Sequence, residues 1–271
     1  MKRMMEHAIT TDGSEGQTSL IRSSDLINLI HEVIKKDLAL AGIDPYEIHP
    51  PIDQPKPEMT IAGFLKKKDQ DICVTPKDIK KKRRLVDWGP CRFEKVYDEY
   101  GEDYITHTLV INVRSQLSSI AKNSDTLFER TFAEPMNLRM VYNDIVLGEV
   151  YLIPVVEYDD KAMKEKVVKF KKNRVNLQKY ISFFTAISNC GELGEDYYKY
   201  ERCALIIVDF RPDIPKVYHS TQELVDNELL PKTYPLEYAD ISYDSFIDDI
   251  LNIYRERFGN NHIFSGSMYF E

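Results

Sequence analysis

Cysteine is scarce in this chain, and the four that occur, Cys73, Cys91, Cys190 and Cys203, lie far apart. They form no C-x-x-C pair and have no closely spaced histidine. Zinc sites and disulfide frameworks both need such spacing, so the sequence predicts neither. Reduced thiols in the cytoplasm are the expected state.

Long hydrophobic runs are also missing. The longest, Ala204 to Val208 and Val150 to Val156, are far shorter than the roughly 18 residues that cross a bilayer. No apolar segment follows the charged start of the chain, so we expect no membrane span and no secretion signal. Hydrophobic residues still make up 43% of the 271 residues, which is enough for a real core.

Several motifs of common enzyme classes are absent. The sequence has no Walker A loop, no G-x-G-x-x-G, no G-x-S-x-G, no H-E-x-x-H and no kinase signature. These absences argue against nucleotide-driven, dinucleotide-dependent and serine-hydrolase functions.

Positive charge is in deficit overall, with a net charge of −8. Proteins that coat nucleic acid without sequence preference are usually basic, so this balance argues against that class. Lysine and arginine nevertheless gather in three segments, Lys66 to Lys68, Lys77 to Arg84 and Lys161 to Lys179. Such runs usually form solvated surface, and only a position near a cleft would favour a binding role.

Helix and strand patterns alternate through most of the chain. Residues 1–22 are polar and show no periodicity, so they predict a mobile leader before a domain of residues 23–271. Apolar spacing predicts helices over 23–42, 125–138 with Pro135 kinking or ending it, 161–188, 220–231 and 246–258, and strands over 61–75, 104–114, 147–156 and 203–210. This order predicts a single α/β domain with a central mixed β-sheet flanked by helices.

Two carboxylates stand together near the first strand. Asp69 and Asp71 are two residues apart, so a regular strand would project both from one face while Ile72 and Val74 point into the core. Paired carboxylates at such a place can hold Mg²⁺, which neutralises charge on a phosphate and activates water. The alternative is a solvated strand entrance beside basic residues.

A second polar segment follows the next strand. Asn112 and Arg114 alternate with Ile111 and Val113, and a donor-rich stretch comes after them. Side chains of this kind contact phosphates and base edges in protein–DNA complexes. The candidate DNA-binding residues are Ser115, Gln116, Ser118, Lys122 and Asn123. A polar loop before the helix at 125 is the alternative interpretation.

Here the chain contains, in order, an acidic strand, a long hairpin, a second strand with a polar and charged pair, and a helix with Glu129, Arg130 and Glu134. This order resembles the core of the PD-(D/E)xK nucleases, especially type II restriction endonucleases. In that family an Asp on the first strand and an acidic residue on the second bind the metal, and a Lys two residues on positions the water. Asp69 or Asp71 matches the first position, while Asn112-Val113-Arg114 stands where the family has Glu/Asp-x-Lys. Arginine stays protonated and cannot carry a proton as lysine does.

The resemblance implies a restriction-endonuclease-like fold and a Mg²⁺-dependent homodimer that cuts duplex DNA in cellular defence. In this interpretation Asp69 and Asp71 hold Mg²⁺ and Arg114 contacts the scissile phosphate. Two alternatives stay open: a catalytically inactive DNA-binding or assembly subunit of the same fold, and an interaction protein with no nucleic-acid role.

A competing site lies further along the chain. Asp159-Asp160-Lys161 is a formal D-x-K match, with Asp144 upstream and Glu149 and Glu157 on the strand between. Asp160 is also explained as a helix cap with Lys161 in the first turn. Asp78-Ile79-Lys80 matches the same pattern inside a lysine-rich loop. We expect His31, His107 and His219 to be structural or exposed, since none has a partner at ligand spacing.

Overall fold

A mixed β-sheet forms the centre of the computed structural model, which describes residues 1–191 and 195–265. Six strands of these residues follow one another in the sheet in the order β1, β4, β7, β8, β9 and β10. They comprise β1 (Ile48–His49), β4 (Ile72–Val74), β7 (Leu109–Ser115), β8 (Val146–Pro154), β9 (Arg202–Asp209) and β10 (Lys216–Val217). The central strands β7, β8 and β9 are parallel, and the outer strands are antiparallel to their neighbours.

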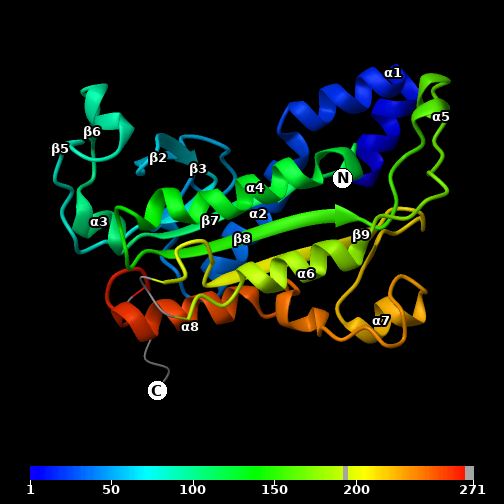
Figure 1. Ribbon diagram of the computed structural model, residues 1–271. Coiled ribbons are helices and arrows are strands. Elements are labelled where there is room, and N and C mark those ends of the chain that lie inside the picture. The colour runs from blue at the N-terminus through cyan, green and yellow to red at the C-terminus, as the bar shows by residue number, and fades with distance from the viewer. Residues whose placement is uncertain (192–194, 266–271) are drawn as a thin grey trace.

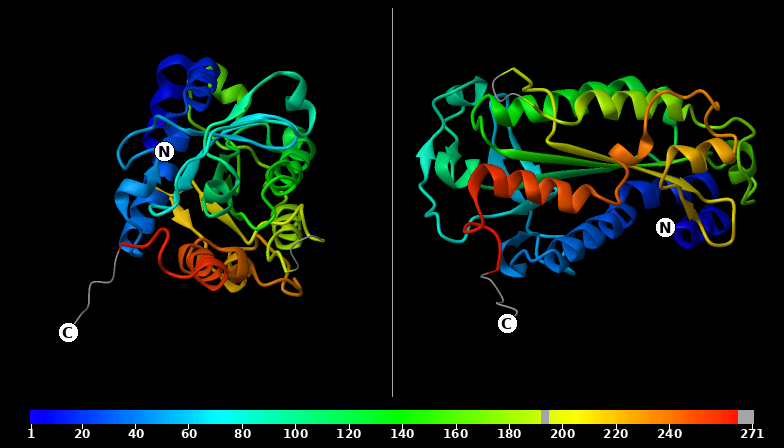
Figure 2. Two further views of the ribbon diagram at one scale, coloured as in Figure 1. Left: turned by 90° about the vertical axis from the view of Figure 1, so that its left-hand side faces the viewer. Right: turned by 90° about the horizontal axis from the view of Figure 1, so that it is seen from below.

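Helices cover both faces of this sheet (Figures 1 and 2). One face packs against α2 (Asp25–Leu40) and α8 (Phe246–Phe258), and the other against α4 (Ile120–Arg139) and α6 (Leu177–Ile187). Strand β7 shows why, because Leu109, Ile111 and Val113 belong to the first core and Val110 belongs to the second. The expected α/β domain with a central mixed sheet flanked by helices is therefore confirmed.

Shorter elements occupy the two ends of the sheet. The β2–β3 and β5–β6 hairpins lie with η1, η2 and α3 toward the end where β8 begins. Toward the end where β8 finishes lie α5, α7 and η3. Their bounds are η1 Pro45–Glu47, β2 Met59–Ala62, β3 Lys67–Gln70, β5 Arg84–Leu85, η2 Pro90–Phe93, β6 Tyr97–Asp98, α3 Glu102–Thr106, α5 Asp160–Lys164, α7 Thr221–Asp226 and η3 Tyr238–Ile241.

Three expected elements are divided in the structure. The strand predicted over 61–75 is divided among β2, β3 and β4. The strand predicted over 104–114 begins as α3 and becomes β7 only at Leu109. The helix predicted over 161–188 is two helices, α5 and α6. Lys166 adopts a left-handed φ of 59°, which ends α5, and the Asn176 side chain accepts a hydrogen bond from the Lys179 N–H and begins α6.

The first 22 residues differ most from expectation. Instead of a leader without regular structure they form α1 (Lys2–Arg22), which packs on α5 and α2. Met5 and Ile9 are fully buried one turn apart. The helix folds back at Gly13, whose φ is 65° and whose missing side chain leaves room for the Met163 carbonyl. The domain therefore includes residues 1–22; at its other end the predicted range runs through 266–271, which lie outside the described residues.

A pair of neighbouring methionines tests this packing. Met5→Ala is expected to lower the free energy of unfolding by about 2–5 kcal/mol, because it leaves a cavity in a buried site. Met4, 37% exposed, is the matched control, and Met4→Ala is expected to change stability by less than about 0.5 kcal/mol. Urea denaturation of both variants measures the difference, and equal stability of the two would show that α1 does not pack as described.

Candidate functional site

Asp71 stands where one strand changes partner. Strand β3 before it pairs with β2, and strand β4 after it pairs with β7 in the register Ile72 to Ile111. At the division between them, one Asp71 carboxylate oxygen accepts a hydrogen bond from the Val113 N–H at 2.8 Å. The carboxylate thus replaces a backbone contact that the diverging strand no longer makes, and it is held against β7.

Ionic side chains continue from this point across the sheet. Asn112 on β7 lies opposite Glu149 on β8 in the parallel register, and both residues are almost fully buried. The Arg114 guanidinium makes an ion pair with Glu149 and lies 3.6 Å from a carboxylate oxygen of Glu134 on α4. Glu134 also pairs with Lys68 of the β2–β3 hairpin. A continuous ionic chain therefore runs from the hairpin to the centre of the sheet.

Several buried polar atoms without a partner belong to residues that adjoin Asp71 or its bonded partner Val113, or that lie within reach of the Asp71 charge. Within the described residues, His31 Nε2, Gln70 Oε1, Asn112 Oδ1 and Glu149 Oε2 are buried and have no hydrogen-bond partner. Buried polar groups in proteins are nearly always bonded, because leaving one unpaired costs about 1–3 kcal/mol. Such atoms beside a carboxylate are candidates to bind an ion, another ligand or an ordered water.

Burial shapes the protonation of this cluster. It raises the pKa of Glu149 above its ordinary value, and the Arg114 guanidinium opposes part of that rise. The carboxylates around Arg114 outweigh burial there and raise the pKa of its guanidinium, so Arg114 stays charged. The site therefore holds a fixed positive charge beside a carboxylate that burial makes harder to ionise.

His31 on α2 lies within reach of the Asp71 charge and gives a pH prediction. Burial lowers its pKa, Lys35 lowers it further, and Asp71, Glu58 and Glu32 act in the opposite direction. The unfolded chain then binds more protons than the folded one below about pH 6.5, so stability is expected to fall as the pH falls.

Urea denaturation between about pH 7 and 5 tests this, with His31→Gln as the variant. Its free energy of unfolding is expected to depend less on pH, by up to about 1.4 kcal/mol per pH unit. Burial also lowers the pKa of His49, which stays in both proteins and serves as a common background. Parallel pH profiles would contradict a neutral, buried His31.

Asp69 lies apart from Asp71. It is exposed on the hairpin and accepts a hydrogen bond from the Thr60 hydroxyl of the opposing strand. The regular alternation expected of the two aspartates is interrupted, because β3 ends at Gln70 and β4 begins at Ile72. The structure therefore brings Asp71, Asn112 and Arg114 together and leaves Asp69 at the outer edge.

The residues expected to contact DNA are divided as well. Gln116 is buried, and its carboxamide oxygen accepts hydrogen bonds from the hydroxyls of Tyr151 and Tyr180 at 2.6 and 2.9 Å. It holds β7, β8 and α6 together inside the protein, although the sequence predicts a surface residue there. Ser115, the last residue of β7, and Ser118 beyond it are half-buried, while Lys122 and Asn123 are exposed on the first turn of α4.

The competing site does not assemble. Asp144 precedes β8 and Asp159 follows it, and a nine-residue strand separates its ends by about 30 Å. Asp159, rather than Asp160, caps α5 by accepting hydrogen bonds from the Lys161 and Ala162 N–H groups. Asp78 is bonded to His262.

Glu149 belongs to the site around Asp71, although sequence reasoning assigned it to the competing site. Its position in the sequence suggests the competing site, whereas the structure joins it to Arg114. Its signal in the sequence is a lone carboxylate inside an apolar strand. Buried carboxylates need a cationic partner, and the strand register decides which cation supplies it.

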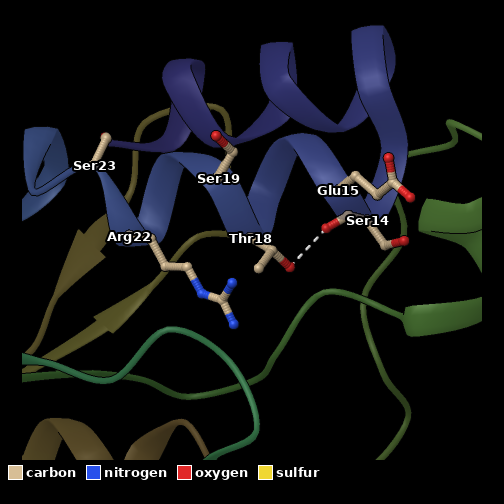
Figure 3. Close-up of a pocket in the computed structure, with 6 residues that line it drawn as sticks. All are labelled: Ser14, Glu15, Thr18, Ser19, Arg22 and Ser23. Carbon is tan, nitrogen blue, oxygen red and sulfur yellow. Dashed lines mark hydrogen bonds between the residues drawn. The ribbon is translucent and has the colours of Figure 1, made fainter.

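A hollow of about 620 Å³ runs along the second half of α1 (Figure 3). Its polar side chains are those of Ser14, Glu15, Thr18, Ser19, Arg22 and Ser23. All six belong to one helix and its end, and none contributes a buried unpartnered atom. This hollow therefore lacks the convergence of strands and charges that surrounds Asp71.

Three negative findings complete the description of the site. Among residues 1–191 and 195–265, no group of three or more His, Cys, Asp and Glu side chains is arranged to hold a metal ion. No helix in that part of the chain is both long and apolar enough to cross a membrane. No protein-family model, curated protein or solved structure matches the chain.

Proposed function

We propose that this protein is a Mg²⁺-dependent endonuclease that hydrolyses phosphodiester bonds of duplex DNA, with Asp71 at its catalytic centre. The observation that carries the proposal is the cluster around Asp71, where buried oxygens without partners lie beside a protonated Arg114. The restriction-endonuclease-like fold and a homodimer, which would cut both strands, belong to the same proposal.

The oxygens around Asp71 fit Mg²⁺. One Asp71 oxygen is used by Val113, which leaves the other, with Asn112 Oδ1 and Glu149 Oε2, as hard donors. Mg²⁺ usually takes one or two carboxylates and keeps several waters, so it needs no cluster of three acidic side chains. When bound, it would neutralise charge on the phosphate and activate a water. The carboxylate of Asp69 would add negative charge at the outer edge of this site.

Basic side chains supply the remaining roles. Arg114, held between Glu149 and Glu134, is positioned to bind a phosphate oxygen but not to carry a proton. The lysine that the family places on this strand is missing. Lys68, on the neighbouring β3 and paired with Glu134, is the residue we assign to its role.

A second candidate function is that of an inactive DNA-binding or assembly subunit. The engagement of Arg114 by two carboxylates favours it, because an arginine so neutralised attracts a phosphate less strongly. Incubation with unmethylated phage and plasmid DNA, with and without Mg²⁺, separates the candidates. Discrete fragments that require Mg²⁺ support the endonuclease, and intact DNA with salt-sensitive binding supports the subunit. Absence of binding would leave a protein that interacts with other molecules.

A further inference from the structure

We propose that residues 63–98, here called the basic module, grip the phosphate backbone of duplex DNA beside the candidate site. This inference rests on the proposed function for its choice of DNA. The module carries 11 Lys and Arg against 6 Asp and Glu, a net charge of +5, although the whole chain has a net charge of −8. The module and the segment from Lys161 to Lys179, which has 8 Lys and Arg against 1 Glu, are therefore both able to attract a polyanion, and the module is the one that adjoins Asp71.

Apart from β4, which lies in the central sheet, the module is a structured projection. The β2–β3 hairpin, whose first strand precedes the module, and the β5–β6 hairpin enclose a small core of Ala62, Val86 and Cys91, with Trp88 and Val96 packed against it. The Asn137 side chain on α4 accepts a hydrogen bond from the Leu65 N–H at 2.7 Å and so ties the hairpin to the domain. Figure 1 shows β5 and β6 at one end of the molecule, far from α5.

This projection leads directly to the candidate site. Strand β3 begins at Lys67 and ends next to Asp71, a separation of about 13 Å for four extended residues. Lys68 of the same strand joins the ionic chain to Arg114 through Glu134. A duplex held by the module would therefore pass close to Asp71.

The positive charges of the module are largely available. Seven of its exposed cations have no carboxylate within 4 Å among the described residues, namely Lys66, Lys77, Lys80, Lys81, Lys82, Arg92 and Lys95. The segment from Lys161 to Lys179 also holds exposed cations outside any ion pair, although Lys171 pairs with Glu157 and Asp160, and Lys179 pairs with Asp125. Its position beside Asp71, rather than charge alone, distinguishes the module.

An aromatic side chain stands out among these charges. Phe93 is 75% exposed, and the Arg92 guanidinium lies over its ring at 4.6 Å. Exposed aromatics on a basic surface stack on bases or wedge between them. We assign Phe93 to contact with the groove while the lysines bind phosphates.

Salt-dependent binding tests the module without cleavage. Fluorescence anisotropy with a short labelled duplex in EDTA gives the slope of log K against log salt concentration. The triple variant Lys80→Ala, Lys81→Ala, Lys82→Ala is expected to reduce the size of this slope by up to about 2.7, or about 0.9 for each phosphate that the protein no longer neutralises. Phe93→Ala is expected to weaken binding with little change of slope, since it removes no charge.

The matched control removes the same charge at the other end of the molecule. Lys161→Ala, Lys164→Ala, Lys169→Ala changes three exposed lysines on and after α5 and is expected to leave the slope unchanged. Equal effects of the two triple variants, or no binding to DNA at all, would overturn the proposal. Binding to anionic vesicles but not to DNA would overturn it in favour of a lipid surface.

Failure of this inference is distinguishable from failure of the proposed function. An Asp71→Asn protein that binds DNA with the unchanged slope shows that gripping is independent of hydrolysis. Wild-type protein that binds through the module but never cuts supports the inference and contradicts the endonuclease. If the Lys80 to Lys82 variant cuts DNA at the wild-type rate and its slope is unchanged, the endonuclease is supported and the inference about the module is contradicted.

Discussion

Replacing Asp71 with asparagine is expected to reduce Mg²⁺-dependent DNA cleavage by at least about 1,000-fold. The change removes the carboxylate charge that would hold the metal. Loss of about 4 kcal/mol of transition-state stabilisation corresponds to this factor. Asparagine has the same shape, and its carbonyl oxygen can still accept the hydrogen bond from the Val113 N–H. The fold is therefore expected to stay intact, which thermal unfolding of the variant checks.

Two further substitutions make this result specific. Asp213→Asn changes an exposed aspartate in a surface loop and is expected to cut at the wild-type rate. Asp69→Asn, at the outer edge of the proposed site, is expected to have an intermediate effect. Full activity of Asp71→Asn would refute the site, and inactivity of the wild type itself would favour the inactive subunit.

The fold was predictable where apolar spacing is regular. The central strands β8 and β9 and the helices α2 and α8 follow from runs and stripes whose period is plain in the sequence. Helix α1 was not predictable, because its glycines and polar residues hide the two positions, Met5 and Ile9, that the domain buries. Its helical state depends on packing against α5, which overrides local propensity.

The site was predictable in part for a similar reason. Asp71, Asn112 and Arg114 were identified from the chemistry of single strands, and the pairing of β4 with β7 brings them together. The interruption of the strand at Asp71, which separates Asp69 from it, depends on two different pairing partners. The link from Glu149 to Arg114 depends on the parallel register of β7 and β8, which no single segment encodes.

The largest stability loss is expected at Glu201, which joins the two helical layers. Its carboxylate is fully buried and pairs with Arg139 of α4 and with Arg257 of α8, the latter at 3.0 Å. It also accepts a hydrogen bond from the Leu147 N–H at 2.7 Å. Glu201→Gln removes the negative charge and leaves two guanidinium groups without compensation. The free energy of unfolding is expected to fall by about 3–5 kcal/mol.

Chemical denaturation measures this loss against an exposed pair. Glu99 lies 2.9 Å from Arg83, and both side chains are at least half exposed. Glu99→Gln is therefore expected to cost less than about 1 kcal/mol, because water already solvates both charges. The double variant Glu201→Gln, Arg139→Met removes one of the stranded cations along with the carboxylate charge, and it is expected to regain part of the stability. A Glu201→Gln protein as stable as Glu99→Gln would mean that water reaches both guanidinium groups and that this end of the sheet is open.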